Sequence, residues 1–344
     1  MAEAVDAEPG PAKPMLLSDI RDQKPAIETL QAALVADRLS HAYLFVGPSG
    51  VGKEKTAIAL ACARNCEVAP GVGCRTCRVC ARVWAGSHPD VRVFHPREDG
   101  NHNLKVEYIR EEILPFTHFA PFEAKVAFLI FPQADVSLPT QHAEAANALL
   151  KTLEEPRAGI VFVLLSERPD RLLSTIRSRS QRVRFGPLPR ATLADILEVN
   201  GVPADQRETA AALAMGRADR AIDLAQDDRA QLLLDWALRL DEAVDARRPG
   251  ALLDLAEELA RSGDRDLVLE TLSLFYRDVA AAALGNAETL LFAHRSDEIE
   301  ARARQLSAGD AAGRFAAIQE TFTSLDRNAN AEVTLDALLF GMSR

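Results

Sequence analysis

Residues 41–61 read HAYLFVGPSGVGKEKTAIALA, and this stretch indicates the fold. Its first part, Ala42–Val46, is a short apolar run with the composition of a buried strand. The glycine-rich segment Gly47–Gly52 follows, and Thr56–Ala63 is an alanine-rich run that favours a helix. The stretch therefore predicts a strand, a tight turn and a helix in direct succession.

A strand, a glycine-rich turn and a helix are the context of a phosphate-binding P-loop. Lys53 would reach the β- and γ-phosphates, and backbone N–H groups would converge on phosphate around three glycines, Gly47, Gly50 and Gly52. The next residue should be Ser or Thr, whose hydroxyl binds Mg²⁺, but this chain has Glu54. Thr56 lies about half a helical turn further on and cannot substitute. The loop has the shape of a nucleotide site without its metal ligand, so binding of ATP or ADP stays open.

All five cysteines fall within one short stretch: Cys62, Cys66, Cys74, Cys77 and Cys80. The Cys74-x2-Cys77-x2-Cys80 spacing places three thiolates on one tight loop, and a fourth would close a tetrahedral, structural Zn²⁺ site. Cys66 is the preferred fourth ligand because a glycine-containing segment follows it. Cys62 lies one turn earlier, inside the helix, and remains the alternative. The nearby His88 is expected to be an ordinary surface residue.

Length, hydrophobic content and net charge indicate a globular protein with more than one domain. The 344 residues, 48% of them hydrophobic, allow two or three packed domains. The net charge of −10 argues against free-standing nucleic-acid binding through a basic surface, although DNA contact inside a larger complex is compatible with it. No apolar run approaches the roughly 20 residues of a membrane span. Met1–Pro14 is expected to be a disordered tail without a secretory signal, which favours a cytoplasmic location.

The rest of the chain predicts an α/β domain followed by helices. Further strands are expected at Val91–His95, Lys125–Phe131, Gly159–Leu165 and Gln181–Phe185. Helices are expected at Ser18–Ala36, at Val106–Leu114, where Pro115 would stop the helix, and at Ala143–Leu153. Strands alternating with helices indicate a parallel sheet over residues 15–187. From Ala191 onward the pattern is helical, with a small helical region at 188–227 and a larger one at 228–344.

Four further segments complete an ordered set of motifs. These are the cysteine loop, AANALLKTLEEP (Ala145–Pro156), TIRSRSQ (Thr175–Gln181) and NANAEVTLDALLF (Asn328–Phe340). Together with the P-loop stretch they resemble the AAA+ subunits of the bacterial DNA polymerase III clamp loader, over roughly residues 15–344. The resemblance implies an AAA+ domain with a zinc module (15–187), a helical lid (188–227) and an oligomerisation collar (228–344). It also implies partners: γ/τ and δ subunits in a hetero-oligomeric ring, and through them the sliding clamp and primer–template DNA.

The family contains an ATP-hydrolysing type, γ/τ, and a stator type, δ′, and departures from its motifs separate them. A working Walker B strand ends in Asp-Glu, but here Pro132 and Gln133 stand at those positions, and Asp135 lies beyond the proline. The sensor-2 arginine is also displaced, since Asp219 stands at its expected place. Loss of the metal-ordering positions should abolish phosphoryl transfer. The sequence thus favours a non-hydrolysing δ′ role, with a γ/τ-type ATPase as the alternative.

One motif of the family's chemistry is retained. Its Ser-Arg-Cys motif supplies an arginine finger to the neighbouring subunit's ATP site, and here it reads Ser178-Arg179-Ser180. The resemblance therefore implies that Arg179 acts in trans, whereas Arg182 and Arg184 are expected to be solvated. An unrelated P-loop kinase with a zinc-stabilised lid is a third class, but it does not explain TLEEP followed by SRS.

Overall fold

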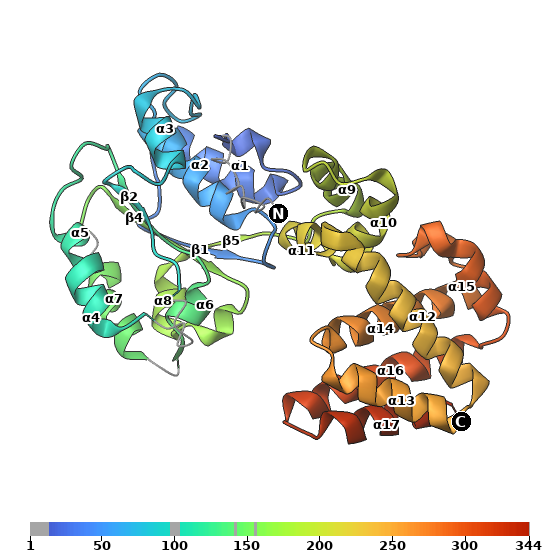
Figure 1. Cartoon of the computed structure of the whole chain (residues 1–344). Helices are drawn as coiled ribbons and strands as arrows, with labels where there is room; N and C mark the ends of the chain where they lie inside the picture. Colours follow the sequence, from blue (N-terminus) through green and yellow to red (C-terminus); the bar gives the residue numbers. More distant parts are fainter. Residues whose placement is uncertain (1–13, 97–103, 141–142, 155–156, 344) are drawn as a thin grey trace, which may run out of the picture. The chain divides into compact units, whose positions relative to one another are not determined.

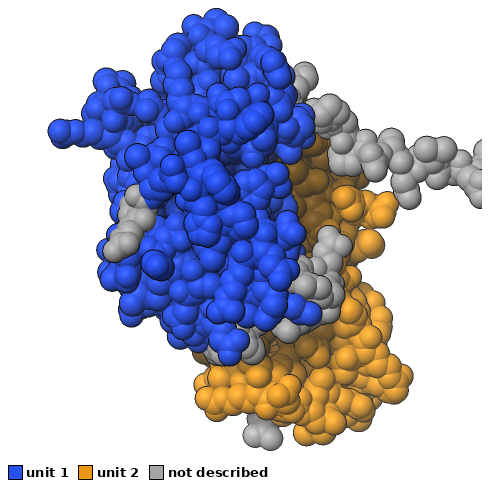
Figure 2. All heavy atoms as spheres, turned by 90° about the vertical axis from the view of Figure 1, so that its left-hand side faces the viewer, with its two compact units in different colours: residues 1–189 blue, residues 190–344 orange. Residues whose placement is uncertain are grey.

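The computed structural model describes residues 14–96, 104–140, 143–154 and 157–343, and the statements below concern those residues. The chain forms two compact units, Met1–Pro189 and Arg190–Arg344, which are blue and orange in Figure 2. The predicted tail at residues 1–14 lies outside the described residues, apart from Pro14. The predicted collar and all of the predicted lid except residues 188 and 189 fall within the second unit, so the division between them stays a prediction.

A five-stranded parallel sheet forms the centre of the first unit, as the buried apolar runs predicted (Figure 1). Across the sheet the strands are β2 (Val91–Val93), β3 (Ala127–Phe131), β4 (Ile160–Ser166), β1 (Ala42–Val46) and β5 (Gln181–Arg184). β1 lies between two strands that come much later in the chain, since Tyr43 pairs with Val163 on one side and with Gln181 on the other. Because every pairing is parallel, the P-loop leaves the sheet at the edge where the other strands also end.

Helices connect these strands. The described helices of the first unit are α1 (Lys24–Val35), α2 (Lys53–Asn65), α3 (Arg78–Trp84), α4 (Val106–Tyr108), α5 (Leu114–His118), α6 (Ala134–Ser137), α7 (Ala143–Glu154) and α8 (Ser174–Arg179). Gln23, just before α1, binds the far end of the unit: its side-chain amide donates to the Gly186 carbonyl (2.8 Å) and accepts from the Gly186 N–H (2.9 Å). The start of the unit is therefore tied to the residues that lead into the second unit.

The prediction that Pro115 stops a helix was wrong. The chain runs from α4 through a π-helical turn, Ile109–Ile113, directly into α5, which has Pro115 in its first turn. Proline lacks an N–H and its ring clashes with the carbonyl one turn earlier in a regular α-helix. The wider π-helical turn directly before it relieves that conflict, so the helical path continues to His118.

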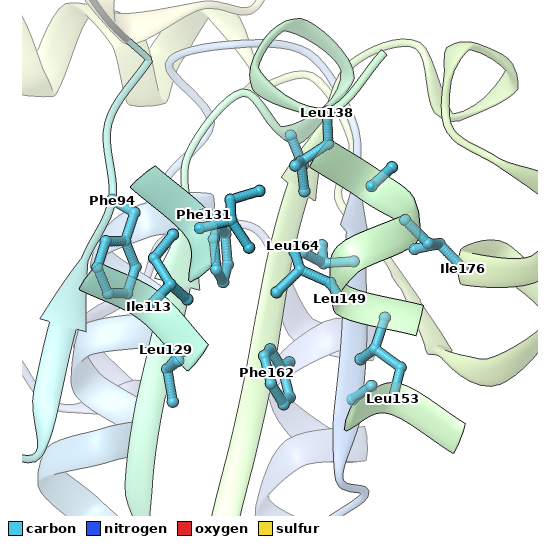
Figure 3. Packing of buried hydrophobic residues seen from close by; sticks show 14 of the residues in the cluster. Phe94, Ile113, Leu129, Phe131, Leu138, Leu149, Leu153, Phe162, Leu164 and Ile176 are labelled. Carbon is cyan, nitrogen blue, oxygen red and sulfur yellow. The ribbon is translucent and has the colours of Figure 1, made fainter. Parts of the chain in front are cut away.

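The main core packs one face of the sheet against α7, α8 and the π-helical turn (Figure 3). The Phe131 ring of β3 stacks between Phe94 and Phe162, with ring centroids 5.2 Å and 6.4 Å apart. β3 and β4 are buried along their entire length, which explains why their sequences are continuous apolar runs rather than alternating ones.

The described part of the second unit is helical. Its helices are α9 (Arg190–Val199), α10 (Ala204–Leu213), α11 (Ala218–Ala225), α12 (Arg229–Ala246), α13 (Pro249–Arg261), α14 (Arg265–Ala283), α15 (Ser296–Ala303), α16 (Ala308–Asp326) and α17 (Ala331–Met342). Among the described residues, no helix has both the length and the apolar character that crossing a membrane requires.

A buried polar cluster joins four of these helices. Asp241 of α12 accepts from the Tyr276 hydroxyl of α14 (2.8 Å) and pairs with Arg302 of α15 (Nε to Oδ2, 2.9 Å) and Arg314 of α16 (3.2 Å). Each member needs the others because an unpaired buried charge is strongly unfavourable. The cluster therefore specifies how α12, α14, α15 and α16 pack.

Candidate functional sites: the P-loop and a cysteine cluster

The P-loop glycines serve two different purposes. Gly50 (φ 66°) and Gly52 (φ 94°) have left-handed backbones, which only glycine adopts without strain. Gly47 has an ordinary backbone, but a Cβ there would lie 2.3 Å from the carbonyl oxygen of Phe185. The first glycine is thus required by the close approach of the chain after β5, and the other two by the turn into α2.

Lys53 is buried and bound to its own loop. Its Nζ donates to the carbonyl oxygens of Gly47 (2.6 Å) and Pro48. An ammonium group placed this way stands at the centre of the loop, where phosphate oxygens would meet it. To contact a phosphate it would exchange these carbonyl acceptors for phosphate oxygens.

The metal-ordering hydroxyl is absent, as the sequence indicated. Glu54 is in the first turn of α2 with a half-exposed carboxylate, 3.9 Å from His95 Nε2. Thr56 is buried, and its hydroxyl donates to the Gly52 carbonyl at 2.8 Å. The Thr56 hydroxyl is therefore bound to the backbone of its own helix.

The end of β3 carries no acid. Pro132 and Gln133 follow Phe131, and Gln133 has a left-handed backbone (φ 49°) as it enters α6. The next acid, Asp135, is buried, and its Oδ2 accepts the backbone N–H of Arg168 at 3.0 Å. Asp135 therefore holds the segment after β4 in place.

Arg179 is the last residue of α8, and its guanidinium is half exposed. Its Nη2 lies 2.8 Å from Glu154 Oε1 and its Nη1 donates to the Thr175 carbonyl at 3.2 Å. Arg182 and Arg184 are exposed on the edge strand β5, as predicted. In the second unit, Arg220, beside the expected sensor-2 position, makes two hydrogen bonds to the Glu270 carboxylate (3.1 and 2.6 Å).

The structure brings four cysteines together: Cys66, Cys74, Cys77 and Cys80. Their Sγ atoms all lie within 4.8 Å of one another, and the Cys66 and Cys77 sulfurs are 3.9 Å apart. Tetrahedral zinc with Zn–S bonds of about 2.3 Å requires sulfur–sulfur distances of about 3.8 Å, so the arrangement fits such an ion.

Backbone N–H groups orient three of these sulfurs. Cys66 accepts from Ala69 (3.2 Å), Cys74 from Cys77 (3.2 Å) and Cys77 from Cys80 (3.4 Å). Such donors stabilise thiolates, and the N–H groups of Cys77 and Thr76 lower the pKa of Cys74 to about 6. Burial has the opposite effect on Cys80, whose pKa it raises to about 12.

Cys62 stands outside this group. It is buried in α2, its sulfur lies 3.9 Å from the Cys80 carbonyl oxygen, and burial raises its pKa far above the ordinary range. It therefore behaves as a small apolar side chain beside the cluster.

The prediction that His88 is a surface residue was wrong. It is 2% exposed, its Nδ1 accepts the Asp90 N–H (3.1 Å), and its Nε2 lies 3.6 Å from Glu123 Oε1. Asp90 in turn accepts the backbone N–H groups of three residues, 122–124. The sequence carries no signal for the contacts of His88 and Asp90 with residues 122–124, because they join segments more than thirty residues apart and follow no short motif.

Comparison with known proteins agrees with these features. Residues 22–189 match the family model described as DNA polymerase III, delta subunit. The chain is 29% identical to DNA polymerase III subunit delta' of Bacillus subtilis over 321 residues, 92% of this chain and 95% of that protein. It is also 38% identical to the delta' subunit of Escherichia coli over 168 residues, 48% of each chain.

The match extends to the other subunit type. Subunit tau of Bacillus subtilis is 38% identical over 174 residues, 50% of this chain and 29% of that protein. A solved gamma subunit-related protein from Thermotoga maritima overlaps with 92% of this chain and 99% of its own at 18% identity and a TM-score of 0.37, a likeness that carries no further conclusion. The chain is thus similar to the delta' subunits of DNA polymerase III, and its likeness to the Bacillus subtilis delta' subunit runs through nearly its whole length.

Proposed function

We propose that this chain is the non-hydrolysing δ′ stator of the clamp loader and donates Arg179 to a neighbouring subunit's ATP site. In this proposal it joins γ/τ and δ in a cytoplasmic ring that loads the sliding clamp onto primed DNA. The observation that carries the proposal is a contrast within one domain. Both metal-ordering positions are lost, at Glu54 and at the end of β3, while Arg179 is retained on the surface.

Phosphoryl transfer depends on positioning and on neutralising charge at the phosphates. In this chain the hydroxyl of Thr56 donates to the Gly52 carbonyl, and one carboxylate oxygen of Asp135 accepts the Arg168 N–H while its other oxygen is buried. Neither side chain is placed to order Mg²⁺ or an attacking water. These commitments support a stator over a motor.

The proposed role of Arg179 rests on its chemistry and exposure. A guanidinium delivered to a γ-phosphate stabilises the charge that develops in the transition state. Arg179 lies at a helix end, and its ion pair with Glu154 is a half-exposed contact that a phosphate could replace. Arg182 and Arg184 are more exposed but lie on β5, outside the Ser-Arg motif.

We also propose that Cys66, Cys74, Cys77 and Cys80 hold one Zn²⁺ ion. When bound, zinc would supply a structural cross-link with no open coordination position. The four cysteines connect the end of α2 to the start of α3, a segment with little apolar core of its own. Nucleotide binding at the P-loop is a weaker expectation, because Glu54 brings a carboxylate toward the phosphates.

A γ/τ-type ATPase is the second candidate, favoured by the 38% identity with tau. ATP hydrolysis by the purified chain, at saturating Mg²⁺-ATP, separates the two. The stator proposal expects no turnover above a Lys53→Ala control. Turnover comparable to that of a purified γ/τ subunit, lost in Lys53→Ala, would establish the motor instead.

A further inference from the structure

Two phenylalanines beyond α5 project into solvent. Phe119 and Phe122 are 71% and 85% exposed, whereas Phe116, in α5, is partly buried. We use the term phenylalanine surface for Arg92, Phe116, Phe119 and Phe122. α5 lies at the left of Figure 1, on the side that faces the reader in Figure 2. Exposed aromatic side chains grouped in this way are typical of binding surfaces.

The loop that carries these rings is firmly held. The Asp90 carboxylate accepts the backbone N–H groups of Phe122 (2.7 Å), Glu123 (2.8 Å) and Ala124 (2.8 Å). The Glu123 carboxylate contacts Arg82 of α3 and the buried His88. The loop is thus anchored to Asp90, just before β2, and through Glu123 to α3. A loop fixed in this way loses little conformational entropy when its side chains are bound.

A cavity adjoins the exposed rings. Its volume is about 370 Å³, and it is open to solvent and mostly apolar. Its walls include Pro89, Pro115, Phe116, Pro121, Phe128 and Leu129. Phe119 and Phe122 line its mouth, so a side chain that entered would be covered by their rings. The cavity is large enough for one or two apolar side chains.

The polar groups at the cavity favour a negatively charged ligand atom. The Arg92 guanidinium lies 4.1 Å from the centre of the Phe116 ring, and its Nε donates to the Pro89 carbonyl at 3.4 Å. Its two Nη groups have no partner among the described residues. The acid that lines the cavity, Asp90, is already occupied by three N–H groups. A carboxylate placed against Arg92 would therefore meet an available donor, since the one acid among the described lining residues is already bound.

We propose that the phenylalanine surface binds a segment of another protein that presents an apolar side chain next to a carboxylate. A nucleic acid fits less well. Bases could stack on the rings, but a phosphate backbone needs a track of cations, and Arg92 is the one cation lining the described cavity. The chain's net charge of −10 also opposes binding of a nucleic acid, which is negatively charged. The inference does not depend on the stator role.

The test selects a phage-displayed random peptide library on the intact wild-type chain and titrates an enriched peptide, synthesised with a fluorophore, by anisotropy. We expect enriched peptides to pair Leu, Ile, Phe or Trp with a neighbouring Asp or Glu. Phe122→Ser should weaken binding at least about tenfold, as expected for a central aromatic. Arg92→Gln should weaken it about threefold and reduce its salt dependence. Val199→Ser, which removes an apolar residue 77% exposed on α9, should change nothing.

Several outcomes would overturn the proposal: no enrichment, enriched peptides without acids, or equal binding to Phe122→Ser. Two further outcomes would overturn it by identifying a different occupant of the phenylalanine surface. Fluorescent oligothymidylate that binds wild type and not Phe122→Ser would indicate single-stranded DNA. Wild-type dimers in sedimentation that dissociate in Phe122→Ser would indicate a second copy of the chain. If Phe122→Ser melts at a lower temperature than wild type, Phe119→Ser takes its place.

Discussion

The guanidinium of Arg179 and the carboxylate of Glu154 lie 2.8 Å apart, so the proposed trans-acting arginine is paired within its own chain. The two side chains are 37% and 46% exposed. A pair this open to water contributes at most about 1 kcal/mol. Arg179 can therefore leave Glu154 for a phosphate at small cost, and the pair keeps the guanidinium near the end of α8 until then.

Arg179→Ala should lower the DNA-stimulated ATPase of a clamp loader reconstituted with this chain, and lower clamp loading more. Arginine fingers contribute on the order of 10³–10⁵ in rate at one site, and this chain would serve only one site of several. Total hydrolysis should fall partially. Arg179→Lys should rescue poorly because lysine lacks the planar fork. Arg182→Ala, an exposed arginine on β5, is the matched control, and equal effects of the two alanine variants would contradict the assignment.

The purified chain should hold about one zinc per chain, measured by atomic emission. Cys77→Ser or Cys66→Ser should reduce this below half an equivalent and lower the melting temperature, because metal affinity is coupled to folding. Cys62→Ala is the control: its sulfur lies outside the group of four, so zinc should stay bound. Loss of zinc from Cys62→Ala with retention in Cys66→Ser would identify the other cysteine as the ligand.

Glu54→Thr should restore nucleotide affinity without restoring hydrolysis. The substitution removes a carboxylate near the phosphates and supplies a hydroxyl for Mg²⁺, so binding of Mg²⁺-ADP should tighten about tenfold or more. Hydrolysis should still be absent because the end of β3 has no acid to position water. Calorimetry measures the first effect and phosphate release the second. ATP hydrolysis by Glu54→Thr would show that the missing acid at the end of β3 is not what prevents hydrolysis.

Gly47→Ala should destabilise the first unit by about 2 kcal/mol or more, since its Cβ would overlap the Phe185 carbonyl oxygen, a backbone atom with little room to move. Gly313→Ala offers a matched control in α16, where an added Cβ meets nothing within 4 Å. That variant should be neutral or gain about 0.5–1 kcal/mol from helix propensity. Urea denaturation of both variants checks the contrast.

Asp90→Asn should destabilise the chain at pH 7 by about 2 kcal/mol, because an amide has one acceptor oxygen where three N–H groups converge. Burial raises the pKa of Asp90, but these N–H groups lower it by more, so its net shift is below the ordinary value of 3.8. The stabilisation that the ionised Asp90 gives the folded chain is therefore complete above pH 3.8. It is lost as the pH falls through the lower pKa that Asp90 has in the folded chain.

Melting curves at pH 7, 5 and 3 should show the gap between wild type and Asp90→Asn narrowing only in the most acidic sample. Asp254→Asn, which changes an exposed carboxylate on α13, is the control and should show no gap at any pH. A gap that stays constant down to pH 3 would mean that the charge of Asp90 is irrelevant.

The elements around the P-loop were predictable because each rests on local chemistry. Apolar runs specify β1, β3 and β4, glycines specify the turn, and cysteine spacing indicates a metal cluster whose geometry the structure supplies. Cys66 was predictable as the fourth ligand because it ends α2 and leads into the cysteine loop, whereas Cys62 lies one turn earlier inside the helix.

Long-range polar contacts were not predictable. The burial of His88 and the three hydrogen bonds to Asp90 arise because α3, β2 and the loop after α5 meet in space. No periodicity or motif encodes such a meeting. The prediction at Pro115 was wrong for a related reason. A proline indicates a break in a regular α-helix, and the sequence does not show that a π-helical turn precedes this one.

The order of strands in the sheet also has a consequence for synthesis on the ribosome. β1 emerges early, but the strands on its two sides, β4 and β5, end at Ser166 and Arg184. Until then the backbone N–H and C=O groups of Ala42–Val46 have no native strand to pair with, and Gln23 cannot reach Gly186. Domains with such late pairings are exposed to aggregation while they are made. The nascent chain should therefore need protection by a chaperone up to the moment when residue 186 leaves the exit tunnel.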